Sequence, residues 1–193
     1  MQILRFSDLP ARPWKNGGGT TVEYTVCPDG AGFDDFSWRV SRARVGRHGP
    51  FSAFPGIDRT LAVVEGNGID LAVANRLVRL DRETPPFRFA ADEPIEADLV
   101  DGPIEDLNVM SRRGYWNHSL IRVPLDEARP LALTGEIGVV VAVGAVTIDD
   151  FDGAVERLGD ADAAIVDGPA RVRVAPAGHR AAVLVAEFHH LLR

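Results

Sequence analysis

Short apolar runs of four to eight residues, separated by turn sequences, recur along the whole chain. Runs of this length between glycine, proline, asparagine and aspartate are typical of an all-β sandwich or barrel. Helical periodicity is nearly absent, so we expect only one helical turn after Ser7, which could cap it, and a second short helix near residues 150–158. The expected strands are residues 36–45, 59–65, 69–74, 96–100, 106–110, 115–123, 138–143, 145–148, 163–166, 171–174 and 181–187.

A composition shift near Pro124 divides the chain. Beyond it there is no tryptophan, tyrosine or lysine, and the strands consist mostly of alanine and valine. We therefore expect two β units, approximately residues 1–123 and approximately residues 124–193. Because no proline- or serine-rich linker separates them, we expect one compact body over residues 1–193.

Charge and cysteine content exclude several classes of partner. The 193 residues carry a formal net charge of -7, and no basic stripe is visible, which argues against nucleic acid and anionic membranes. The single cysteine, Cys27, cannot form a disulfide framework or a thiolate cluster and fits a reducing cytoplasm. No secretory signal is visible at the start, and the longest apolar run, residues 139–146, is too short to span a bilayer.

The most unusual stretch is residues 13–21. Three consecutive glycines are tolerated where φ must be positive or where another group approaches the backbone closely. Lys15 is the only lysine among 21 basic residues, so a compact ammonium has been kept at this place alone. We interpret the stretch as an anion- or carbonyl-binding loop; the alternative is a flexible surface turn.

Alternation along the predicted strands places further polar side chains on common faces. Ser37, Arg39 and Ser41 share one face, where the guanidinium of Arg39 offers a bidentate donor pair for a carboxylate. The alternative is a solvated strand face. In the same way Asn108 and Met110 share a face with Asp106, again with a solvated face as the alternative.

A rigid loop precedes the buried run 60–65. Residues 49–59 contain two prolines, two glycines and two aromatic residues, one of them Phe54, and such a loop can position groups for binding. Asp58 and Arg59 end this stretch. They could serve the site or pair with each other as a structural ion pair.

Other chemistries find no support in the sequence. None of the five histidines lies two or four residues from another, and the adjacent pair His189 and His190 would point to opposite faces of a strand. We therefore expect no metal and no cofactor. There is no Gly-x-Ser-x-Gly motif, and the glycine run lacks the ending of a phosphate-binding loop.

Four segments together resemble the HutD/Ves family of bacterial cupin-like proteins. They are residues 13–21 (Pro-Trp-Lys-Asn-Gly-Gly-Gly-x-Thr), 38–43 (Trp-Arg-x-Ser-x-Ala), 49–59 (Gly-Pro-Phe-Ser-x-Phe-Pro-Gly-x-Asp-Arg) and 106–110 (Asp-x-Asn-Val-Met). Leu107 stands where the family usually has an aromatic residue. The resemblance implies a bicupin, two small jelly-roll barrels in one chain, without the histidine set that holds metal in typical cupins. It also implies a link to histidine degradation and a ligand such as an N-substituted glutamate, although Ves-like members lie outside that pathway.

Three function classes follow. The first is a non-catalytic, regulatory protein that binds a small carboxylate in the N-terminal barrel, with Lys15 and Arg39 as cations, Asn16 and Asn108 as amide partners, and the glycine backbone as a close donor. The second is a metal-free isomerase or amide hydrolase that uses Lys15 or Asp58 as acid or base, and the third is a structural interaction module. The sequence leaves the oligomeric state open. The predicted ligand-binding residues are Trp14, Lys15, Asn16, Gly17, Gly18, Gly19, Arg39, Ser41, Phe54, Asp58, Arg59, Asn108 and Met110.

Overall fold

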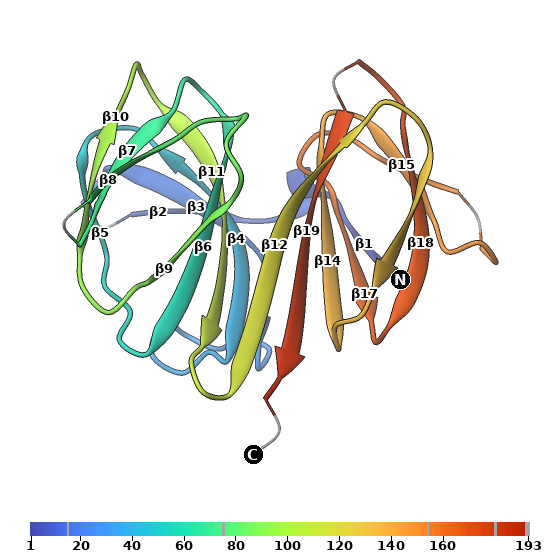
Figure 1. Ribbon diagram of the computed structural model, residues 1–193, viewed down its shortest axis with the longest axis horizontal. Coiled ribbons are helices and arrows are strands. Elements are labelled where there is room, and N and C mark those ends of the chain that lie inside the picture. Colours follow the sequence, from blue (N-terminus) through green and yellow to red (C-terminus); the bar gives the residue numbers. More distant parts are fainter. Residues whose placement is uncertain (15, 75, 154, 180, 192–193) are drawn as a thin grey trace. The chain divides into compact units, whose positions relative to one another are not determined.

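The computed structural model describes residues 1–14, 16–74, 76–153, 155–179 and 181–191, and it is built almost wholly of antiparallel strands (Figure 1). The chain divides into two compact units. The central unit is Pro10–Asn117, and the terminal unit combines Met1–Leu9 with His118–Arg193.

The central unit consists of a six-stranded and a four-stranded sheet, in the orders β2-β3-β4-β11-β6-β9 and β5-β10-β7-β8. Leu61 and Val63 of the first sheet belong to one core with Ile69 and Leu71 of the second. The strands are β2 (Ala11–Pro13), β3 (Gly19–Cys27), β4 (Trp38–Val45), β5 (Gly49–Phe51), β6 (Ile57–Glu65), β7 (Ile69–Val73), β8 (Arg76–Leu80), β9 (Phe87–Ala90), β10 (Ile95–Leu99) and β11 (Ile104–Arg112).

The terminal unit repeats this architecture with sheets of five and four strands, in the orders β1-β17-β14-β19-β12 and β13-β18-β15-β16. Its core joins Val140 and Val185 of the larger sheet to Ile148 and Val172 of the smaller one. The elements are β1 (Gln2–Leu4), the 3-10 helix η1 (Phe6–Asp8), β12 (Trp116–Leu125), β13 (Arg129–Leu133), β14 (Ile137–Val143), β15 (Val146–Asp149), β16 (Glu156–Leu158), β17 (Ala163–Asp167), β18 (Ala170–Pro176) and β19 (Ala181–His190).

The boundary between the units differs from the one read from composition near residue 123. β1 pairs antiparallel with β17, Ile3 opposite Ala164, so the first nine residues join the C-terminal part of the chain (Figure 1). Composition cannot show this pairing, because three residues at the start of a chain carry little pattern of their own.

All eleven predicted strands are present with small shifts of their ends, and further strands were missed, mostly short ones at sheet edges. The one long omission is β3, which follows the glycine run. The expected helix near residues 150–158 is wrong, because Glu156–Leu158 forms β16 and the Asp150 side chain accepts a hydrogen bond from Gly153 N in a turn. η1 is present, but its N-cap is Arg5 and no side chain caps it, so the expected role of Ser7 is also wrong.

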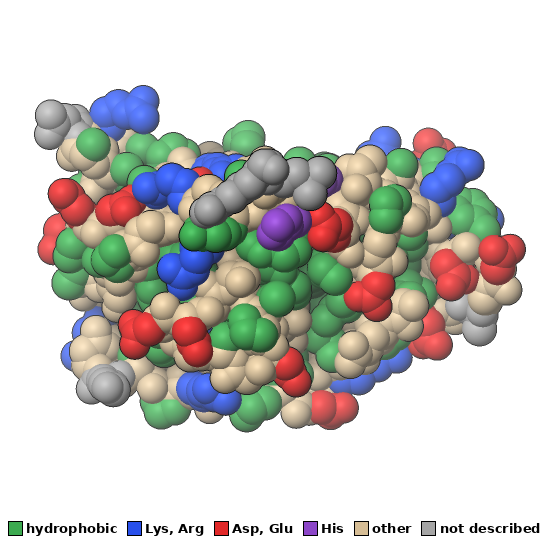
Figure 2. Space-filling view, turned by 90° about the horizontal axis from the view of Figure 1, so that it is seen from below, with side chains coloured by type: hydrophobic (Ala, Val, Ile, Leu, Met, Phe, Trp, Pro, Cys, Tyr) green, Lys and Arg blue, Asp and Glu red, His purple; other side chains and the backbone are tan. Residues whose placement is uncertain are grey.

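The surface mixes charges of both signs. Figure 2 shows acidic and basic side chains interspersed over the visible face, with apolar side chains between them. Over the described residues, no helix has the length and apolar character needed to cross a bilayer.

Candidate functional site

A cavity of about 660 Å³ opens over the six-stranded sheet of the central unit. Neighbouring strands β4, β11 and β6 supply its floor, and their register aligns the side chains in rows. Arg39, Met110 and Arg59 form one row, and Ser41 lies opposite Asn108 in the next. Since alternate residues of a strand share a face, these five side chains all line the cavity.

Arg39 is held in place on one side of the cavity. Its Nε donates to Glu23 Oε2 over 2.6 Å, and its guanidinium carbon lies 4.7 Å from the centre of the Phe33 ring. Only 8% of Arg39 is exposed. The side chain is therefore fixed through Nε, and its terminal N–H groups end at the cavity.

Arg59 has an equivalent arrangement on the other side of Met110. Its Nε donates to Asn108 Oδ1 over 2.7 Å, and its guanidinium carbon lies 4.6 Å from the centre of the Phe51 ring. Burial lowers the pKa of Arg59 to about 10; the field of Asp106 opposes this effect and that of Arg39 adds to it. Arg59 thus remains a cation at neutral pH in a poorly solvated place, which a bound anion would stabilise.

Asp106 lies on β11 two residues before Asn108 and is fully buried. Asn108 Nδ2 donates to its Oδ1, whereas Oδ2 has no hydrogen-bond partner in the part of the chain that the structure describes. Burial raises the pKa of Asp106 to about 7, although Arg59 and the hydrogen bond from Asn108 both favour the ionised form. Arg59 at the cavity floor therefore interacts with a buried carboxyl group that lies outside the cavity lining.

Aromatic rings form the walls. Trp14 donates from Nε1 to Thr21 Oγ1 over 2.7 Å and meets the Phe51 ring edge-on at 6.5 Å between centroids. The ring of Phe54 packs against that of Phe33, with 5.8 Å between the ring centroids. Trp14, Phe33, Phe51 and Phe54 all line the cavity, so a ligand there would meet cations at the floor and apolar surface around it.

Gly17 and Gly18 lie in the turn between β2 and β3, Gly19 begins β3, and none of the three lines the cavity. Gly17 N donates to Trp14 O, and Gly18 N donates to Asn16 Oδ1, each over 2.9 Å. The N–H groups of Gly17 and Gly18 are used within the turn, and the role of this backbone as a ligand donor stays a prediction. Asn16 lines the cavity, and Lys15 lies outside the described residues, so its role stays a prediction.

Gly19 is required by packing. A Cβ at this position would lie 2.1 Å from the carbonyl oxygen of Arg44, which belongs to the backbone of β4. We expect Gly19→Ala to lower the free energy of unfolding by at least about 2 kcal/mol, because the strand cannot give way as a side chain can. Urea unfolding measures this. Gly32→Ala is the matched control, since its nearest neighbour is an Asp35 side-chain atom at 3.5 Å; equal losses in both variants would contradict the prediction.

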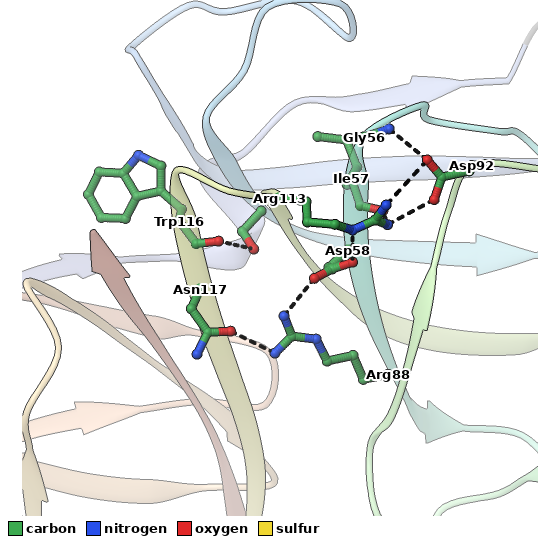
Figure 3. A network of polar contacts seen from close by, with 9 residues as sticks. Gly56, Ile57, Asp58, Arg88, Asp92, Arg113, Trp116 and Asn117 are labelled. Atoms are coloured by element: carbon green, nitrogen blue, oxygen red, sulfur yellow. Dashed lines mark hydrogen bonds and ion pairs between the residues drawn. The ribbon is translucent and has the colours of Figure 1, made fainter. Parts of the chain in front are cut away.

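Asp58 lies apart from the cavity lining, in an exposed polar network shown in Figure 3. It accepts from Arg88 and from Arg113, each over 2.8 Å, and Arg113 also pairs with Asp92. Partial burial alone would raise the pKa of Asp58, but the hydrogen bonds from the two arginines outweigh it and lower the pKa. The suggested Asp58–Arg59 ion pair is thus wrong, because neighbouring residues of a strand point to opposite faces.

The structure brings together eight of the predicted residues: Trp14, Asn16, Arg39, Ser41, Phe54, Arg59, Asn108 and Met110. It adds Glu23, Phe33 and Phe51 to the lining, and it places Asp106 in a hydrogen bond with Asn108. Glu23 belongs to the missed strand β3, where Val22, Tyr24 and Val26 alternate with polar residues. That alternation was the signal that could have revealed it.

No group of three or more His, Cys, Asp or Glu side chains within the described ranges could hold a metal ion. The donors that face the cavity are chiefly guanidinium and amide groups, which suit anions.

Fold and cavity together define a class of protein. A cupin 2 conserved barrel domain protein from Leptotrichia buccalis matches with a TM-score of 0.60 over 96% of this chain and 95% of that chain, at 10% identity, a level that shows the fold alone. The predicted all-β bicupin fold is confirmed. The chain is a cupin-like protein with an arginine-floored cavity in its central unit.

The particular family is shown by the HutD family model, which matches residues 6–184, so this chain belongs to the HutD family. A conserved protein of unknown function from Pseudomonas aeruginosa PAO1 has a TM-score of 0.89 at 30% identity, covering 97% of this chain and 98% of that chain. HutD from Pseudomonas fluorescens SBW25, in a structure described as a formate condition, has a TM-score of 0.82 at 30% identity, covering 99% of each chain.

A curated relative matches over a shorter segment. The Pseudomonas putida protein described as an uncharacterized 21.2 kDa protein in the hutC 3' region is 38% identical over 110 residues. That segment is 57% of this chain and 57% of the relative, so the chain spans little more than half of the relative's length.

Proposed function

We propose that this protein binds a small carboxylate in the cavity of the central unit, without metal, and serves a regulatory role in histidine degradation. One observation carries the proposal: two buried arginines face the same cavity, each anchored through Nε and stacked on a phenylalanine. A guanidinium has five N–H donors, so after Nε is used each arginine keeps four for a ligand.

The charge balance of the cavity favours an anion. Glu23 offsets Arg39, but the buried Asp106 is only partly ionised near neutral pH and does not fully offset Arg59. Planar carboxylates match the donor spacing of a guanidinium and can accept two parallel hydrogen bonds from it. The aromatic walls suit a ligand with an apolar or planar part beside its carboxylate.

The family supplies the biological context of the proposal. One relative is named for its place in the hutC region, and the Pseudomonas fluorescens HutD structure is described as a formate condition. An N-substituted glutamate from histidine breakdown is therefore our first candidate ligand. Of the two residues considered as acid or base in the enzyme alternative, Asp58 is ion-paired with two arginines outside the cavity lining, which favours binding over turnover for that residue. Lys15, the other, lies outside the described residues.

A ligand screen tests the proposal. Thermal unfolding of the full chain would be followed with formate, glutamate and N-substituted glutamates, and hits would be measured by calorimetric titration. A true ligand at 100 times its dissociation constant should stabilise the fold by about 2.7 kcal/mol. The amide of the same compound, which lacks the negative charge, serves as the control. If no carboxylate stabilises the protein more than its amide, the proposal is wrong.

A further inference from the structure

Asp106 is a buried acid that none of the roles described so far uses. It lies on β11 two residues before Asn108 and faces the same side of the sheet, but it is fully buried and does not reach the cavity. An acid in this position must either be paired with a positive charge or be protonated, because an isolated ionised carboxylate is strongly disfavoured away from water.

The hydrogen bonds of Asn108 determine the orientation of its side-chain amide. A guanidinium can only donate, so the atom of Asn108 that meets Arg59 Nε must be the amide oxygen. The amide nitrogen therefore points to Asp106 and donates to its Oδ1. Asp106 thus sets the orientation of Asn108, and Asn108 sets the orientation of Arg59 at the cavity floor.

The other oxygen of Asp106 is the place for a proton. Among the described residues Oδ2 has no hydrogen-bond partner, and the atom is buried away from the surface, so no donor side chain offsets a negative charge there. Burial shifts the protonation equilibrium of this group into the neutral range, with a pKa of about 7.

The charged groups around Asp106 come from each neighbouring strand. Arg59 of β6 and Arg42 of β4 favour its ionised form, and Glu105 of β11 opposes it. Arg42 is itself paired with Glu105 over 2.6 Å, and Arg39 of β4 is paired with Glu23 of β3. Arg59 is therefore the cation whose charge Asp106 modulates, and it is also the cation that faces a ligand.

We propose that Asp106 is a positioning residue of the anion site that takes up a proton when an anion binds beside Arg59. The inference rests on the proposed function, since it needs an anion in the cavity. The bound anion and an ionised Asp106 would compete for the one positive charge of Arg59. Binding therefore draws a proton from solvent onto Asp106 Oδ2, and anion affinity falls as the pH rises through neutrality.

The test uses formate, which remains ionised throughout the range and brings no proton of its own. Affinity of the full chain for sodium formate would be measured at pH 6 and pH 8.5, and proton uptake would be counted in a pH-stat near pH 7.5. We expect roughly tenfold weaker binding at the higher pH, and about half a proton taken up for each formate bound.

Two variants show which acid takes up the proton when formate binds. Asp106→Asn keeps the shape of the protonated acid and should bind formate with no proton uptake and little pH dependence. Glu23→Gln removes the acid that lines the cavity and should retain the uptake. If Asp106→Asn does not fold, the Asp106 carboxyl carbon of the wild type, followed by NMR, should titrate near neutrality and shift to higher pH with formate.

The outcomes separate the two proposals. Formate binding to the wild type without proton uptake would overturn the role of Asp106 and leave carboxylate binding intact. Proton uptake that persists in Asp106→Asn would do the same. If neither formate nor any other carboxylate of the ligand screen binds at either pH, both proposals are contradicted.

Discussion

Arg59→Met will lower carboxylate affinity by 30-fold or more, the largest effect that we expect from a single change in the cavity. The guanidinium is buried, stacked on Phe51 and fixed through Asn108, so a bound carboxylate there forms a desolvated charge pair. Truncating one member of such a pair typically costs about 2 to 5 kcal/mol. Methionine keeps much of the volume, and calorimetric titration with formate measures the loss.

Two further variants sharpen this prediction. Arg59→Lys keeps the charge but cannot both donate to Asn108 and offer a planar pair of donors, so it should also bind poorly. Arg79→Met is the matched control, since Arg79 is an exposed arginine paired with Asp70 and does not line the cavity. Wild-type affinity in Arg59→Met, or an equal loss in Arg79→Met, would refute the assignment of Arg59.

Asp106→Asn will gain stability relative to the wild type as the pH rises from acid to alkaline values. The wild-type acid has a pKa of about 7 when folded, against an ordinary value of 3.8, so the folded state binds the proton more tightly than the unfolded chain. Its contribution to stability is therefore fully present below pH 4 and is lost as the pH rises to about 7. Asparagine has no such titration.

The expected difference is large enough to measure by urea unfolding. Relative to wild type, Asp106→Asn should gain roughly 3 kcal/mol between pH 5 and pH 8, because one pKa unit corresponds to about 1.4 kcal/mol. Glu83→Gln, which changes an exposed acid, should show no such trend with pH. A difference between Asp106→Asn and wild type that stays constant over this range would mean that Asp106 is ionised throughout.

Strand alternation allowed much of the site to be predicted from the sequence. Arg39 and Ser41 had to share a face, as did Asn108 and Met110, because a period of two is fixed by strand geometry. The same rule excludes a contact between Asp58 and Arg59, and the structure places Asp58 with Arg88 and Arg113.

Pairing between distant strands could not be read in this way. Glu23 meets Arg39 only because β3 lies beside β4, and nothing in the local sequence around either residue gives that register. The glycine run was assigned to the ligand because of its composition. At Gly19, glycine is required because the backbone of β4 at Arg44 lies too close for a side chain. Arg44 is 25 positions away in the sequence, so local patterns do not show this contact.

The pairing of β1 with β17 makes the terminal unit discontinuous along the chain, with the central unit inserted into it. On the ribosome, residues 10–117 are available early and can fold from contacts within one continuous segment. The first residues must wait for a partner more than 150 positions later, and long-range pairings of this kind form slowly. The order of synthesis thus lets the cavity-bearing unit form first, while the terminal unit, which needs residues after 117, is completed later.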